Sequence, residues 1–389
     1  MNVYIYDKVL EELEHQVGAV PLFGVHHDQS MVVLSRTAAA NLVQVGIGVQ
    51  DVRALAEPLT RGERVVVRSV KGAPEVVVLA DGKLVEGCKV EVFGLHRDIL
   101  ARANGIVECR EFDGLCVGFL GTGSVATLMA RALVQAGVTK LVAVDDGRVS
   151  VPNVSRYAFG LEAVGLPKVE ALRNMLMMVN PSVDVTMVNA RLTLETFVEV
   201  QTALAGCDLV IIATDSVRSN LMGQEVTWRL GIPTEVVGAY ERASGGEVMW
   251  CIPGRTACLH CLRAALAQPE SSAAGPFDYT SASGPADLKA EPGLSVDVGL
   301  IALAATKQAI AFLAGRTGPG TALDLGMPLM LIGNEATWVF EGPFQFSRVR
   351  VLKDPDCWVC GKPPVQVAPN ELEILDTADD PRHPSRKGG

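Results

Sequence analysis

The fold assignment depends on Leu115-Cys-Val-Gly-Phe-Leu-Gly-Thr-Gly-Ser-Val-Ala126, in which an apolar run passes through a glycine turn into a helical pattern. The apolar half predicts a buried strand, and Val125–Ala136 predicts the helix that follows it. Gly121 and Gly123 let the backbone turn tightly and approach a phosphate, and Ser124 begins a helix whose free N–H groups would face that phosphate. This strand, turn and helix together predict a nucleotide-binding site.

Apolar strands and helices alternate on the C-terminal side of this segment. The predicted elements are the strands Leu141–Val144, Val183–Val188 and Leu209–Ala213 and the helices Lys168–Val179 and Leu194–Leu204. Because continuously apolar strands alternate with helices, the sequence predicts an α/β fold with a Rossmann-like mixed, mostly parallel sheet and helices on both faces. Later strands, up to Trp338–Leu352, are expected to be partly antiparallel.

The chain divides into three predicted regions. Residues 1–92 contain short β-branched runs split by Gly, Asp and Pro, which predict a small β-rich module that recognises a substrate or a partner. Residues 93–365 carry the α/β pattern. Within them, residues 267–293 are rich in Ser, Ala, Gly and Pro and predict a long functional or mobile loop. Residues 366–389 are polar and are expected to form a flexible tail.

Composition excludes several classes of protein. The chain has 389 residues, of which 49% are apolar and 20% charged, so it can bury a large core. A net charge of −10 without a basic cluster argues against nucleic-acid binding. No uninterrupted apolar run reaches the roughly 18 residues that cross a bilayer. The best candidate, Val298–Ala314, contains Lys307 and Gln308 and predicts a buried helix. Since no secretory signal opens the sequence, we expect a cytoplasmic protein without membrane spans.

Polar residues that could hold a nucleoside triphosphate follow the predicted strands. Asp145 ends the second strand, where an acid can accept hydrogen bonds from ribose. Asn153, Arg156 and Lys168 offer donors and positive charge to the phosphates, and Asp215 suits Mg²⁺. Singly, Arg156 and Lys168 could be solvent-exposed charges, and Asp215 a helix N-cap. Together they favour ATP over a nicotinamide or flavin, because an oxidoreductase needs no such cations beside a metal-binding acid.

Two CxxC pairs, Cys258/Cys261 and Cys357/Cys360, predict a structural zinc ion. Four thiolates complete a tetrahedral site, and without a secretory signal metal is favoured over a disulfide. His260 is expected to lie beside this site rather than in it. The other cysteines lie in or beside apolar runs and are expected to be inert: Cys88, Cys109, Cys116, Cys207 and Cys251.

An ordered set of motifs resembles the ThiF/MoeB/ubiquitin-activating-enzyme superfamily. The motifs are GTGSVA at 121–126, VDDGRVSVPNVSR at 144–156, GLPK at 165–168, NP at 180–181, DLVIIATDS at 208–216, PGRTACLHC at 253–261 and DCWVC at 356–360. The resemblance implies that Mg-ATP is used to adenylate the C-terminal carboxylate of a ubiquitin-like protein, sulfur carrier or peptide with a glycine tail. It implies that Asp145 binds ribose, that Asn153, Arg156 and Lys168 hold phosphates, and that Asp215 binds Mg²⁺. It also implies a homodimer, and it leaves room for a downstream conjugating enzyme.

The resemblance extends to a short arm before the nucleotide strand. Leu95–Ala101 is similar to the family's arm, whose arginine, here Arg97, reaches the γ-phosphate side of ATP in a partner subunit. The alternative is a local ion pair of Arg97 with Asp98 or Glu108.

The sequence departs from the family at two places. Gly147 stands where members often carry a second acid, although Asp146 lies beside it. No cysteine lies between Cys261 and Cys357, where thioester-forming members carry one, and Lys289 stands near that position. Either the reaction stops at the acyl-adenylate, or the thiol has been lost or replaced. A non-catalytic partner subunit that binds a ubiquitin-like protein is therefore an alternative, and an NAD or FAD oxidoreductase is a weaker one.

Overall fold

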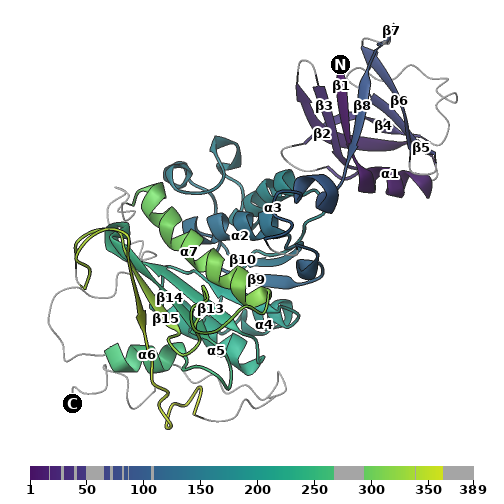
Figure 1. The fold of residues 1–389 in the computed structure, drawn as a ribbon. Helices are drawn as coiled ribbons and strands as arrows, with labels where there is room; N and C mark the ends of the chain where they lie inside the picture. The colour runs from purple at the N-terminus through teal and green to yellow at the C-terminus, as the bar shows by residue number, and fades with distance from the viewer. Residues whose placement is uncertain are drawn as a thin grey trace. The chain divides into compact units, whose positions relative to one another are not determined.

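The computed structural model describes residues 1–16, 18–27, 30–38, 42–49, 65–70, 73–80, 83–85, 87–106, 109–266, 293–337 and 339–361. Within these ranges the strands form two sheets of eight strands each (Figure 1). The chain divides into two compact units, the first comprising residues 1–115, 127–141 and 148–185 and the second residues 116–126, 142–147 and 186–389. The predicted loop at 267–293, apart from Gly293, and the predicted tail at 366–389 lie outside the described residues.

The first sheet lies in the first unit and has the strand order β7-β6-β5-β4-β2-β3-β1-β8. Its strands are β1 (Asn2–Tyr6), β2 (Val20–His27), β3 (Ser30–Ser35), β4 (Val43–Gly48), β5 (Val65–Val70), β6 (Ala73–Ala80), β7 (Lys83–Leu84) and β8 (Lys89–Phe93). Strand β1 runs parallel to β3 and β8, whereas β2 is antiparallel to β3 and β4. The β-rich character predicted for this region is confirmed.

Helix α1 (Asp7–Glu14) was not predicted, and it covers the core of this sheet. Its Val9, Leu10 and Leu13 are buried, while the glutamates between and after them face outward. A Cβ on Gly48 of β4 would lie 2.2 Å from Cδ2 of Leu13, so only glycine leaves room for this leucine. The helix is short and has a single apolar stripe, which makes its sequence signal weak.

The second sheet has the strand order β11-β10-β9-β12-β13-β14-β15-β16. Its strands are β9 (Cys116–Leu120), β10 (Lys140–Val144), β11 (Asp184–Val188), β12 (Leu209–Ile212), β13 (Thr234–Ala239), β14 (Gly245–Cys251), β15 (Leu329–Gly333) and β16 (Gln345–Val349). Strand β12 runs parallel to β9 and β13, and β13 to β16 pair antiparallel. These pairings confirm the predicted Rossmann-like mixed sheet with antiparallel later strands.

Six α-helices lie after β9 in the described part of the chain. They are α2 (Ser124–Ala136), α3 (Lys168–Val179), α4 (Phe197–Leu204), α5 (Val217–Arg229), α6 (Leu259–Leu266) and α7 (Ser295–Leu313). The glycine turn thus lies between β9 and α2, as predicted. Helix α4 begins later than the predicted Leu194, because Thr193 and Thr196 hydrogen-bond to each other in the turn before it.

Helices cover both faces of the second sheet, as the alternation of its side chains requires. On one face, Val210 of β12 and Val236 of β13 share a core cluster with Val226 of α5. Trp250 of β14 points to the opposite face, where its Nε1–H donates to Oε1 of Gln308 at 3.1 Å. Gln308 belongs to α7, which crosses this face of the sheet in Figure 1.

Only the inner side of α7 is buried, so the predicted buried helix is wrong for its outer side. Val298 and Ile301 are buried, whereas Val296 and Leu303 are 70% and 59% exposed. The helix is apolar on both sides, and apolar composition alone does not reveal which side faces the sheet. Among the described residues, α7 is the one helix long and apolar enough to cross a membrane, a property that core helices of soluble proteins share.

Candidate functional site

The predicted phosphate loop, Gly121–Gly123, lies in the second unit between β9 and α2, and its shape depends on Gly121. This residue has a φ of +85°, and a Cβ added to it would lie 2.6 Å from the carbonyl oxygen of Ala213. A larger residue would therefore be strained and would clash with backbone. The N–H of Gly121 donates to the carbonyl of Val144 at 2.9 Å. Ser124 begins α2, so the first N–H groups of that helix, which lack partners within it, follow the loop directly.

Asp145 shapes this loop with both carboxylate oxygens. Oδ2 accepts the N–H of Thr122 at 2.8 Å, and Oδ1 accepts the N–H of Gly147 at 2.7 Å. The ribose contact implied for Asp145 stays a prediction. The structure also gives Gly147 a backbone role, because its N–H orients the Asp145 carboxylate.

Asp215 follows β12, and it does not cap the next helix. The N-cap of α5 is Ser216, whose Oγ accepts the N–H of Ser219 at 3.2 Å. The side chain of Thr214, on the other side of Asp215, donates to Oδ1 of Asn220 at 2.6 Å. Asp215 is therefore not the N-cap of α5, and it is exposed to solvent. Because β9 and β12 are parallel neighbours, their carboxyl ends place the phosphate loop and Asp215 at one edge of the sheet.

Asn153, Arg156 and Lys168 belong to the first unit, on the segment that leads into α3. Oδ1 of Asn153 accepts the N–H and the Oγ–H of Ser150, at 2.9 and 3.0 Å, and so caps a 3₁₀ turn at Val151–Ser155. With this oxygen engaged, the side-chain NH₂ group is the end of Asn153 that can donate to a phosphate. The backbone N–H of Arg156 donates to the carbonyl of Asn153 at 3.1 Å, which keeps the backbones of these two residues close together.

Tyr157 follows Arg156 in the sequence and lies beside Lys168 in the structure. Nζ of Lys168, the first residue of α3, lies 6.0 Å from the centroid of the Tyr157 ring, within the range of a cation–π contact. Tyr157 directly follows Arg156, so the Lys168 ammonium lies beside the ring of the residue next to Arg156. Tyr157 was not predicted as a site residue. The pattern that could have indicated it is an aromatic residue immediately after Arg156.

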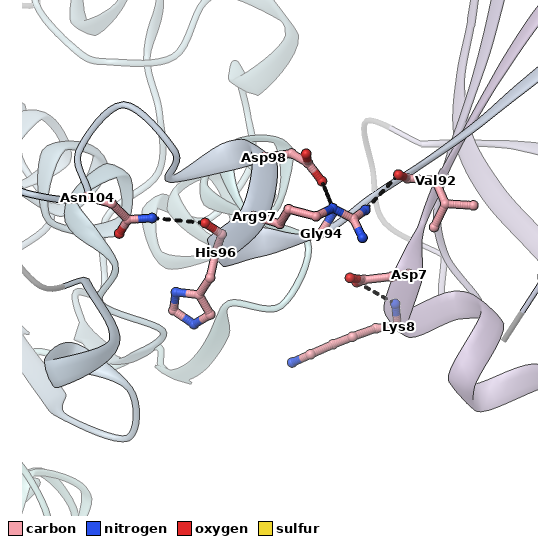
Figure 2. Close-up of polar contacts among 8 residues, drawn as sticks. All are labelled: Asp7, Lys8, Val92, Gly94, His96, Arg97, Asp98 and Asn104. Carbon is pink, nitrogen blue, oxygen red and sulfur yellow. Dashed lines mark hydrogen bonds and ion pairs between the residues drawn. The ribbon is translucent and has the colours of Figure 1, made fainter.

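Arg97 makes the local ion pair that the sequence left open as an alternative. Its Nε donates to Oδ2 of Asp98 at 2.8 Å and its Nη2 to the carbonyl of Val92 at 2.7 Å, as Figure 2 shows. The pKa of Asp98 lies below its ordinary value, because the N–H of Gly94 and then Arg97 donate to its carboxylate. The Arg97 side chain is nevertheless 63% exposed. Glu108, the other candidate partner, lies outside the described residues, as does Lys289.

The four predicted zinc ligands converge in the second unit. The Sγ atoms of Cys258, Cys261, Cys357 and Cys360 are buried and all lie within 4.8 Å of one another. Three of the sulfur pairs, Cys261–Cys360, Cys258–Cys357 and Cys258–Cys261, are 3.3, 3.5 and 3.8 Å apart. Zn–S bonds of about 2.3 Å in a tetrahedron put the sulfurs about 3.8 Å apart, so this donor set fits zinc. His260 is outside the set and lies with its ring 4.8 Å from that of Trp358, as expected of a neighbour rather than a ligand.

Hydrogen bonds within the cluster lower the pKa of two of its thiols, Cys261 and Cys357, and those that raise the pKa dominate at the other two, Cys258 and Cys360. A hydrogen bond from Cys258 is the main reason that the pKa of Cys261 falls to about 7. Bonds from Cys258 and its neighbours also hold the pKa of Cys357 below its ordinary value. The backbone N–H of Asp354 donates to Sγ of Cys261 at 3.4 Å, which adds a fixed donor to that sulfur.

Comparison with known proteins places the α/β part of the chain in one group. The model of the ThiF family matches residues 96–359. Ubiquitin-like modifier-activating enzyme 5 of Caenorhabditis elegans is 29% identical over 171 residues, which are 42% of this chain and 41% of that protein. Molybdopterin-synthase adenylyltransferase of Salmonella typhimurium is 27% identical over 283 residues, 70% of this chain and 97% of that protein.

Solved structures show the same fold at low sequence identity. The crystal structure of E. coli MccB superposes with a TM-score of 0.52 at 16% identity, covering 67% of this chain and 69% of that one. This likeness supports the fold alone. The chain spans about two fifths of the length of the activating-enzyme relative from Caenorhabditis elegans.

Proposed function

Because this chain belongs to the ThiF family, we propose that it is an ATP-dependent adenylyltransferase that activates the C-terminal carboxylate of a ubiquitin-like protein, sulfur carrier or peptide. The observation that carries this proposal is the carboxyl edge of the second sheet. There the phosphate loop, Asp145 and Asp215 follow β9, β10 and β12 in turn. The relative from Salmonella typhimurium, named an adenylyltransferase and matched over 97% of its length, supports the same reaction.

In the proposed reaction an oxygen of the substrate carboxylate attacks the α-phosphorus of ATP. The bond from that phosphorus to the bridging oxygen breaks, and pyrophosphate leaves with the electron pair. The NH₂ group of Asn153, Arg156 and Lys168 would stabilise the negative charge on the phosphates. Asp215 would hold Mg²⁺, which supplies further positive charge to the phosphate oxygens when it is bound. The residues would act by positioning and charge stabilisation, because adenylation requires no covalent bond to the protein.

The four-cysteine cluster would have a structural role. Four thiolates complete the coordination of Zn²⁺ and leave no position for a substrate. Cys258 and Cys261 flank the start of α6, while Cys357 and Cys360 follow β16. A zinc ion held by these residues would tie the last described segment to α6.

ATP–pyrophosphate exchange tests the adenylation proposal directly. The purified full-length chain is incubated with Mg-ATP, labelled pyrophosphate and, one at a time, small ubiquitin-like proteins and sulfur carriers that end in Gly-Gly. We expect label to enter ATP only when a suitable carrier is present. Carrier binding without exchange would instead support a non-catalytic partner subunit, the alternative favoured by the absence of a cysteine between Cys261 and Cys357. A substrate-dependent change in NADH absorbance would support an oxidoreductase.

A homodimer is part of the same proposal. Arg97 is exposed, and it donates to Asp98 and to the carbonyl of Val92, both close to it in its own chain. An exchange of these contacts for phosphate oxygens of ATP in a partner subunit would supply positive charge to the departing pyrophosphate. The dimer is tested by light scattering, and the role of Arg97 by the complementation experiment described below.

A further inference from the structure

Two thiols lie in contact at the amino edge of the second sheet, opposite the edge that carries the phosphate loop. Sγ of Cys116 is 3.7 Å from Sγ of Cys207. Cys116 begins β9, and Cys207 lies just before β12, the parallel neighbour of β9. Both residues belong to the second unit, and neither is one of the four zinc-binding cysteines.

Backbone hydrogen bonds hold Cys116 opposite Asp208, the residue that follows Cys207. The N–H of Asp208 donates to the carbonyl of Cys116 at 2.8 Å, and the N–H of Cys116 donates to Oδ2 of Asp208 at 2.7 Å. A disulfide has an S–S bond of about 2.05 Å, so the two sulfurs must move about 1.7 Å closer than their present separation of 3.7 Å.

Gly118 leaves the space in which the Cys207 thiol lies. A Cβ added to Gly118 would be 3.1 Å from Sγ of Cys207. Cys207 is 7% exposed, whereas Cys116 is half-buried and is the thiol that a small oxidant meets first. The pKa of Cys207 is raised, first because of its hydrogen bond with Cys116 and then because of burial. The raised pKa favours the protonated form of the Cys207 thiol.

We propose that Cys116 and Cys207 are a redox-active pair that forms a reversible disulfide on exposure to a hydroperoxide. The Cys116 thiol loses its proton, and the thiolate attacks one oxygen of hydrogen peroxide. The O–O bond breaks, and the released hydroxide takes up that proton and leaves as water, giving a sulfenic acid. The sulfur of Cys207 then attacks the sulfenic sulfur, the S–O bond breaks, and the hydroxide leaves with the Cys207 proton as a second water. In total, two thiols are oxidised and one peroxide is reduced, giving one disulfide and two waters.

The pairing revises the expectation that both cysteines are inert. That expectation came from the apolar residues around each cysteine in the sequence. Such residues predict that a cysteine is buried, but not which other side chain it contacts. The disulfide would join the amino ends of two strands whose carboxyl ends carry the phosphate loop and Asp215. Since β9 spans about 17 Å at roughly 3.4 Å per residue, the new bond would lie far from the phosphate loop.

Peptide mapping of the full-length protein tests this proposal. Trypsin should release Glu111–Arg131, in which Cys116 is the only cysteine, and Leu192–Arg218, in which Cys207 is the only cysteine. The folded, reduced protein is treated with hydrogen peroxide, its remaining thiols are alkylated, and it is digested without reductant. We expect the two peptides joined, with a mass two hydrogen atoms below their sum, and separated again by dithiothreitol.

Matched variants show whether the geometry is responsible. Cys116→Ser should abolish the joined peptides, while Cys88→Ser, which changes a half-buried cysteine of the first unit, should leave their yield unchanged. Oxidation of Cys116 to a sulfinic acid without the joined peptides would overturn the proposal. So would joined peptides that form as readily in urea-denatured protein, because random pairing would then explain them. The map of the wild-type chain decides the question even if a variant fails to fold.

Discussion

Replacing Gly121 by alanine should damage the phosphate loop in two separable ways. Its φ of +85° is in the left-handed region, where a non-glycine residue costs about 1–2 kcal/mol. The new Cβ would also lie 2.6 Å from the carbonyl oxygen of Ala213, and real Cβ contacts essentially never fall below 3.0 Å. Overpacking of this kind costs about 1–3 kcal/mol. The free energy of unfolding should therefore fall by about 2–5 kcal/mol in Gly121→Ala.

Gly231→Ala is the matched control for the backbone term. Gly231 also lies in the second unit, has a φ of +71°, and has no atom within 4 Å of an added Cβ. Urea unfolding should show a loss of about 1–2 kcal/mol for this variant. The difference between the two variants then measures the clash with Ala213.

The functional consequence should follow the clash rather than the lost stability. Relief of the 2.6 Å contact requires the loop or the end of β12 to move, and both border the proposed ATP site. ATP–pyrophosphate exchange, measured at a temperature where both variants are folded, should be strongly reduced in Gly121→Ala and close to wild type in Gly231→Ala. Equal stabilities of the two variants together with normal exchange by Gly121→Ala would refute the reasoning.

Three further predictions address the metal acid, the zinc cluster and a buried carboxyl group. Asp215→Ala should lower ATP–pyrophosphate exchange by about 10²-fold or more. When this variant is mixed with inactive Arg97→Ala under conditions of subunit exchange, activity should recover toward a quarter of wild type, since half the dimers then hold one intact site. An absence of recovery would show that Arg97 does not act in the partner's site. Cys258→Ser should lose the single zinc ion found by elemental analysis and lower the melting temperature, whereas a metal-free wild-type protein would contradict the assignment. Burial raises the pKa of Glu235 well above 4.5, so the unfolded chain ionises first and stability falls as pH rises above that value. In urea unfolding between about pH 5 and pH 8, Glu235→Gln should therefore gain stability relative to wild type, by up to about 1.4 kcal/mol per pH unit. Parallel pH profiles of the two proteins would show that Glu235 is not protonated in the folded state.

Local sequence patterns were sufficient for the elements around the nucleotide loop. The apolar run before Gly121 and the helical pattern after it each extend over one element, and both appear as β9 and α2. Patterns that depend on a distant residue were not sufficient. The sequence places Asp145 at a strand end, but its contact with the N–H of Thr122 depends on how β9 and β10 lie in the sheet.

The four-cysteine cluster and the Cys116–Cys207 pair differ in how far the sequence alone could predict them. Each CxxC motif is a local spacing with a known chemical use, so the joining of two such motifs could be predicted across almost a hundred residues of chain. Cys116 and Cys207 have no such spacing. Their contact follows from the adjacency of β9 and β12, which only the strand order reveals.

Strand context also explains why a glycine motif alone is weak evidence for a nucleotide site. The end of β9 is held from both sides: the N–H of Gly121 donates to Val144 at the end of β10, and the N–H of Ala213 after β12 donates to Leu120. A glycine turn outside such a sheet would have the same conformational freedom without these two restraints, and its N–H groups would not be held in place for a phosphate. The shape of the predicted phosphate loop therefore depends on three neighbouring strand ends. Glycine contributes the one conformation that lets the chain turn this close to Ala213, where an added Cβ would lie 2.6 Å from the carbonyl oxygen.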